Sequence, residues 1–171
     1  MPRIEICTSK FLDYTQGKSN IFFRRVGSEE NAVSLSAAQI NQLFCSLRTI
    51  EAEADLHWSN LNADAKREFS HHLGWRFYLT LMEFKNCRYY DIRRFWIPPG
   101  QNSIVPTKMG IRFTEKEMDN IRLRKEELYQ ALPGVETVDD CKCFFQGFYQ
   151  NCRRCNPFSN TEKKLVRGKS I

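Results

Sequence analysis

The apolar and polar positions of the chain form two alternating patterns that resemble each other. Residues 3–11 and 76–84 both alternate between apolar and polar side chains, and both runs end on a phenylalanine. A period of two indicates a β-strand with one buried face. A second predicted strand follows each run, over 20–26 and 88–96. The connecting segments are rich in turn-forming residues and cover 16–19, 27–30 and 98–103.

A gap-free internal repeat marks the start of a helix in each half. Residues 32–43 match residues 110–121, and each segment reads as the end of a strand followed by a capping box. In such a box a hydroxyl side chain and a residue three positions later satisfy each other's backbone donors. The two boxes consist of Ser36 with Gln39 and of Thr114 with Glu117.

The segments after the two boxes have the apolar spacing of helices. The first helix is expected to be long and to reach residue 61, and the second runs from Glu115 toward Leu132 and stops at the pair 133–134, Pro-Gly. A shorter polar helix is predicted over 64–71.

These elements divide the chain into four parts. Residues 1–61 form a first β-β-β-α unit, 62–73 a partly helical linker, 74–132 a second β-β-β-α unit, and 133–171 a cysteine-rich basic tail. The predicted fold class is therefore α+β, with two tandem antiparallel sheet-plus-helix units.

The second unit resembles a known family. The segments 74–85, 91–96 and 106–111 have the order and spacing of the C-terminal domain of the positive cofactor four family of transcriptional coactivators. The resemblance implies a curved antiparallel sheet followed by a helix that dimerises, with single-stranded DNA held by the paired sheets. Because the unit occurs twice here, we expect an intramolecular pseudo-dimer with its two long helices packed together. A homodimer is the alternative.

The resemblance also implies a set of binding residues. The family's strand-end aromatic and lysine fall on Phe84 and Lys85, its Asp-Ile-Arg then aromatic-Trp motif falls on 91–96, and one cation of its basic turn falls on Lys108. Three expected cations are replaced by Met82, Cys87 and Met109, for which nearby arginines can compensate. The complete predicted nucleic-acid-binding set is Phe84, Lys85, Arg88, Arg93, Arg94, Trp96, Lys108 and Arg112, with Arg24 and Arg25 in the first unit.

Such a surface binds by stacking bases on aromatic rings and by pairing phosphates with cations. The alternative is that the aromatic residues serve only to build a core, as most aromatic residues on alternating strands do. We assign Phe84 and Trp96 to the site. The residues assigned to the core are Phe77, Leu79, Leu81, Ile92 and Ile111.

The net charge of +6 is concentrated in the tail. The chain has 26 Lys and Arg and 20 Asp and Glu, and residues 141–171 hold seven basic residues and one acidic residue. The first 140 residues are therefore neutral, with 19 residues of each sign. The run 163–169, Lys-Lys-Leu-Val-Arg-Gly-Lys, is interpreted as a nuclear localisation segment, a phosphate-binding tail or a solvated terminus.

Four of the seven cysteines lie within fifteen residues, which is a spacing suited to a tetrahedral zinc site. Free thiols or a redox pair are the alternatives. The candidate zinc ligands are Cys141, Cys143, Cys152 and Cys155.

The remaining patterns limit the class of function. The sequence has no run of roughly 20 apolar residues and no signal peptide, so we expect an intracellular protein that does not enter membranes. The basic run 163–169, interpreted as a localisation segment, adds the expectation of a nuclear location. The sequence has no recognisable enzyme motif, and we expect no catalysis.

The main hypothesis is a protein that binds single-stranded DNA or melted duplex and works with the transcription or replication machinery. The alternative is a protein-interaction or structural module that keeps the fold without strong DNA binding. A cellular and a viral origin both remain open.

Overall fold

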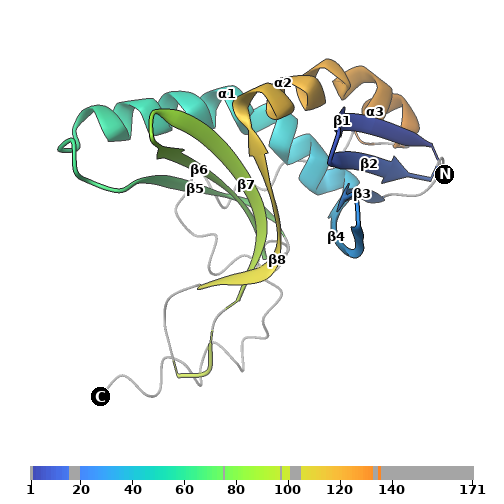
Figure 1. Ribbon diagram of the computed structural model, residues 1–171, viewed down its shortest axis with the longest axis horizontal. Coiled ribbons are helices and arrows are strands. Elements are labelled where there is room, and N and C mark those ends of the chain that lie inside the picture. The colour runs from blue at the N-terminus through green and yellow to red at the C-terminus, as the bar shows by residue number, and fades with distance from the viewer. Residues whose placement is uncertain are drawn as a thin grey trace.

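The computed structural model describes residues 2–15, 20–74, 76–96, 98–100, 105–132 and 135. These residues form two four-stranded antiparallel sheets, each followed by a helix, so the predicted α+β class with two sheet-plus-helix units is confirmed (Figure 1). The first unit consists of β1 (Arg3–Cys7), β2 (Lys10–Tyr14), β3 (Asn20–Arg25), β4 (Ser28–Ser36) and α1 (Ala37–Ser59). The second consists of β5 (Arg67–Gly74), β6 (Phe77–Phe84), β7 (Cys87–Trp96), β8 (Val105–Thr114), α2 (Glu115–Leu123) and α3 (Lys125–Ala131). In both sheets the strand order follows the chain.

Each sheet has four strands where the sequence predicted three. In the first unit, the run 3–11 is not one strand, because a turn at residues 8 and 9 separates β1 from β2. The alignment of 3–11 with 76–84 was therefore wrong by one strand, since it sets β1 against β6, the second strand of its sheet.

The predicted polar helix over 64–71 was also wrong. Residues from Arg67 onward form β5, which pairs antiparallel with β6 along its length. Phe69, His71 and Leu73 face the helices, while the residues between them face the other way. The strand is stabilised by pairing with β6, which its local polar composition does not reveal.

Both predicted capping boxes are present. The Gln39 amide N–H donates to Ser36 Oγ (3.3 Å) and Gln39 Oε1 accepts from the Ser36 N–H (2.8 Å). Thr114 and Glu117 make the same two bonds, both 3.3 Å long. The second helix breaks at Arg124 into α2 and α3, and Leu132 caps α3. The predicted stop at 133–134 lies outside the described residues.

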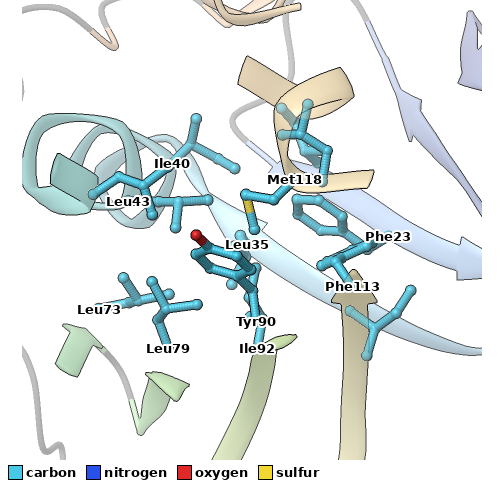
Figure 2. Packing of buried hydrophobic residues seen from close by; sticks show 14 of the residues in the cluster. Phe23, Leu35, Ile40, Leu43, Leu73, Leu79, Tyr90, Ile92, Phe113 and Met118 are labelled. Carbon is cyan, nitrogen blue, oxygen red and sulfur yellow. The ribbon is translucent and has the colours of Figure 1, made fainter. Parts of the chain in front are cut away.

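The two units share one hydrophobic core. Figure 2 shows Phe23 and Leu35 of the first sheet packed with Ile92 and Phe113 of the second and with Met118 of α2. Each helix also reaches the opposite sheet, because α1 packs on β5 and α2 packs on β1. The two sheet-plus-helix units thus pack on each other through a common core.

Hydrogen bonds from each helix to the opposite sheet repeat this exchange. Gln39 Nε2 on α1 donates to the carbonyl oxygen of Gly74 (2.6 Å), and Asn120 Nδ2 on α2 donates to the carbonyl oxygen of Ile6 (2.9 Å). Lys10 Nζ also contacts Glu117 Oε2 at 2.7 Å. Each helix is therefore fixed to the first strand or first hairpin of the other sheet.

The two helical segments also contact each other, as predicted. Tyr129 of α3 donates its hydroxyl to Asn41 Oδ1 of α1 (3.0 Å), and its ring lies edge-on to Phe44, 5.9 Å between centroids. An ion pair joins Arg122 of α2 to Glu51 of α1. None of the helices among the described residues has both the length and the apolar character needed to cross a bilayer.

Candidate nucleic-acid interface

The second sheet has one face toward the helices and one face away from them. The predicted core residues Leu79, Leu81, Ile92 and Ile111 are buried on the helix side, and Phe77 packs against this core. We call the opposite side the outer face. Strand register assigns to it Tyr78, Thr80, Met82 and Phe84 of β6, Tyr89, Asp91, Arg93 and Phe95 of β7, and Gly110 and Arg112 of β8.

The tip of the β6–β7 hairpin presents an aromatic ring beside a cation. Phe84 is the last residue of β6 and 64% of its surface is exposed. Lys85 and Asn86 form the turn, with φ of 50° and 62°. A two-residue hairpin turn of this type needs a positive φ at both of its central residues. Lys85 Nζ lies 5.3 Å from the Phe84 ring centroid. The predicted pair Phe84 and Lys85 is therefore open to a ligand.

The middle of the outer face is packed by its own side chains. The ring of Tyr78 lies 4.6 Å from that of His72 and 4.8 Å from that of Phe95, which makes a row across β5, β6 and β7. Ser70 Oγ and Thr80 Oγ1 are 2.9 Å apart, and Thr80 is buried. This part of the face is a small second core, and it separates the exposed groups at the two ends of the sheet.

Arg93 is held by a buried carboxylate. Its Nε and Nη2 donate to the two oxygens of Asp91 at 2.8 and 3.0 Å, and its Nη1 donates to the carbonyl oxygen of Thr107 at 2.8 Å. A Cβ at Gly110 would lie 2.5 Å from the Arg93 guanidinium carbon, so only glycine leaves room for this arrangement. Arg112 approaches the same carboxylate with its Nε at 3.7 Å. Because Asp91 and Arg93 are two residues apart on a strand, alternation alone places them on one face, a signal that the sequence prediction of Arg93 as a free contact did not use.

Arg88, Arg94 and Trp96 do not lie on the outer face. Arg88 forms an ion pair with Asp55 of α1 and lies over the Trp58 ring at 5.2 Å. Burial works to lower the pKa of Arg88, but the hydrogen bonds and charges of Asp55 and Tyr90 together raise it. Arg94 pairs in register with the helix-facing Phe77.

Trp96 and Phe84 are at opposite ends of the hairpin. Cys87, the register partner of Phe84, lies nine residues before Trp96, a length of about 30 Å in a strand. Trp96 is exposed at the end of β7, where it pairs in register with Val105 of β8. Lys108 and Met109, three and four residues after Val105 on β8, are also exposed. The structure therefore distributes the predicted residues over both faces and both ends of the second sheet and does not gather them in one place.

The two arginines predicted in the first unit lie on different faces of its sheet. Arg24 contacts Asp13 Oδ2 with its Nε at 3.0 Å, and it also donates to the carbonyl oxygen of Glu29. Arg25 is opposite Lys10 in register, and Lys10 reaches Glu117 on the helix side. Asp13 was missed by the sequence prediction, although its place in the alternating pattern, between the core residue Leu12 and the strand end, was a usable signal.

The predicted zinc ligands cannot be placed. Cys141, Cys143, Cys152 and Cys155 lie outside the described residues, as do the cations of the tail. Among the residues that the structure does describe, no group of three or more His, Cys, Asp or Glu side chains is arranged to hold a metal ion. Zinc binding by the tail stays a prediction, which metal analysis of the purified protein would check.

A comparison with models of protein families finds a match, and it lies in the second unit. The family model described as Transcriptional Coactivator p15 (PC4) matches residues 71–123, from within β5 to the end of α2. No curated protein and no solved structure matches the chain. The match covers less than half of the chain, and it includes the hairpin tip, the Asp91–Arg93 pair and the end of β7. Residues 71–123 are therefore similar to the family described as Transcriptional Coactivator p15 (PC4).

Proposed function

We propose that the protein binds single-stranded or melted DNA and acts in transcription or replication. The observation that carries this proposal is the exposed Phe84 ring beside Lys85, at the hairpin tip of a domain that matches a coactivator family. An exposed ring beside an ammonium group suits a nucleotide, because the ring stacks on the base and the cation pairs with the phosphate.

Different residues serve different parts of the interface. Phe84 stacks on a base at the tip of the hairpin, and Trp96, which lies off the outer face at the far end of β7, stacks on one where the strand leaves the sheet. Lys85, Lys108 and Arg112 pair with phosphates of the strand that runs between them. Arg93 is bound to Asp91 and Thr107, so its role is to hold β7 and β8 in place and not to contact the ligand first. A surface of this length fits several nucleotides of an extended strand.

One observation favours a second candidate function, a protein-interaction module that kept the fold. The centre of the outer face is filled by Tyr78, Thr80 and the Asp91–Arg93 pair, and the exposed Phe84 ring lies at one end of it. The chain before the tail is also neutral overall. Such a module would bind oligonucleotides only through its basic tail.

A salt titration with matched variants distinguishes the two. Labelled single-stranded and duplex oligonucleotides are titrated with the full chain, and we expect tighter binding of the single strand, with an affinity that falls as salt rises. Phe84→Ala should weaken single-strand binding by about 1–3 kcal/mol, the contribution of one stacked base. Leu56→Ala is the matched control, since Leu56 is 69% exposed on α1, away from the outer face.

The contribution of the tail is measured in the same assay. A variant with Lys163, Lys164, Arg167 and Lys169 changed to glutamine removes four tail charges and leaves the sheet intact. If this variant loses all binding while Phe84→Ala binds like the wild type, the sheet is not the binding surface and the interaction-module function is favoured.

A further inference from the structure

On the first sheet, the face that points away from the helices carries a buried carboxylate between two arginines. Asp13 is 7% exposed and lies on β2. Arg24 of β3 contacts Asp13 Oδ2 with its Nε at 3.0 Å, and Arg3 of β1 contacts Asp13 Oδ1 with its Nε at 3.4 Å. The Arg3 guanidinium carbon also lies 3.7 Å from the centroid of the Phe11 ring. These residues alternate with Ile4 and Leu12 of the core, which places them on the side away from the helices.

The second sheet carries the same arrangement around Asp91. In each sheet one arginine is close to the carboxylate and mostly covered, with 20% exposure for Arg24 and 21% for Arg93. In each sheet the other arginine is farther from it and half exposed, with 50% for Arg3 and 52% for Arg112. The two clusters occupy different strands of their sheets, so the likeness is one of chemistry and not of repeat position.

The charge of each cluster favours an anion. Each group of one aspartate and two arginines has a net charge of +1, and on the first sheet the exposed Glu5 shares the face of β1 with Arg3. Arg3 and Arg112 both face the carboxylate with Nε, and their terminal nitrogens make no hydrogen bond within the part of the chain that the structure describes. A guanidinium fixed at Nε or stacked on a ring keeps its outer N–H groups in the fork that matches a phosphate.

We propose that Arg3, positioned by Asp13 and Phe11, is a phosphate-binding residue on the first sheet. Its ligand is a phosphodiester of the same nucleic acid that the second sheet binds, and the site therefore rests on the proposed function. Arg112, positioned by Asp91, is its counterpart on the second sheet. The first unit then contributes to binding directly, although the residues matching the coactivator family begin only at position 71.

The experiment compares three arginine-to-glutamine variants of the full chain with equal loss of charge. Arg3→Gln and Arg112→Gln test the two sites, and Arg124→Gln is the control, because Arg124 is also 52% exposed and paired with a carboxylate, that of Glu127. Affinity for a single-stranded oligonucleotide is measured over a series of salt concentrations. Thermal unfolding of each variant checks that it is folded. We expect Arg3→Gln to stay folded, because Asp13 still forms its ion pair with Arg24.

We expect Arg3→Gln and Arg112→Gln each to lower affinity about tenfold and to reduce the salt slope by about 0.7, the value for one phosphate contact on a single strand. Arg124→Gln should bind like the wild type. If Arg112→Gln weakens binding and Arg3→Gln does not, the first-sheet site is refuted while the proposed function stands. Equal losses in Arg3→Gln and Arg124→Gln also refute it, because the effect is then one of overall charge. If the wild type binds no single strand, the proposed function fails and this site fails with it.

Discussion

At the scale of single residues, Gly110 shows how one missing side chain shapes the outer face. Arg93 lies across Gly110 while it binds Asp91 and the carbonyl oxygen of Thr107. Thr107 Oγ1 in turn donates to the carbonyl oxygen of Arg94 at 2.8 Å. The register between β7 and β8 shifts at this point, so these bonds hold an irregular strand in place. Lys108 emerges from this segment.

Substituting Gly110 should destabilise the fold through a clash with Arg93. A methyl group at this position meets the guanidinium at 2.5 Å, and overpacking of this kind costs about 1–3 kcal/mol. We expect Gly110→Ala to lower the free energy of unfolding by that amount in urea titrations. In an Arg93→Ala background the obstacle is gone and the same substitution should cost much less. An equal penalty in both backgrounds would show that the clash is not the cause.

At the scale of elements, the contact between α1 and β5 joins the two units through buried polar groups. Gln42 Nε2 of α1 lies 2.9 Å from Ser46 Oγ and 3.4 Å from His71 Nε2 of β5. Burial, with a smaller effect of the neighbouring His72 charge, lowers the pKa of His71 from 6.5 to about 3. His71 therefore stays neutral in the folded protein over most of the acidic range.

This depressed pKa predicts a loss of stability in acid. The unfolded chain binds a proton at His71 near pH 6.5 and the folded chain does so only near pH 3, so stability from this group is complete above pH 6.5 and decreases as pH falls toward 3. The expected slope is about 1.4 kcal/mol per pH unit between these limits. Chemical unfolding at pH 6, 5 and 4 measures it. His71→Gln should reduce the pH dependence. Identical pH profiles for His71→Gln and the wild type would contradict this assignment.

At the scale of the whole molecule, the shared core makes the two units one folding unit. Residues of both sheets and of α1, α2 and α3 belong to one buried cluster, and each helix contacts the opposite sheet. A sheet that lost its partner would expose apolar surface that the other unit now covers. Hydrophobic burial is proportional to the apolar area removed from water, so neither half is expected to be stable without the other.

The described part of the chain should therefore unfold in a single transition. Far-ultraviolet circular dichroism and tryptophan fluorescence should give coincident curves in urea. Asn120→Ala removes the bond from α2 to the carbonyl oxygen of Ile6 and should shift both curves together by about 1–2 kcal/mol. Asn31→Ala is the control, since Asn31 is exposed and bonds only to near neighbours in the chain. Two separate transitions, or a shift in one probe only, would mean that the units fold independently.

Part of the fold and of the candidate site was predictable from short stretches of sequence. The capping boxes at Ser36 and Thr114, the burial of Leu79 and Ile92 and the exposure of Phe84 all agree with what spacing and resemblance predicted. Caps depend on residues three positions apart, and the burial pattern depends on alternation within one strand. Such features are local, so the sequence by itself determined them.

The tertiary structure decided which groups meet. Residues 67–71 form a strand because β6 pairs with them, and Arg3 meets Asp13 because the register of β1 and β2 brings them together. Arg88 meets Trp58 and Asp55 because α1 packs against the second sheet. Strand pairing and helix docking join residues that are distant in the chain, and their free energy comes from surfaces that exist only after both partners fold. Composition and period describe each surface separately, and only the packed molecule determines its partner.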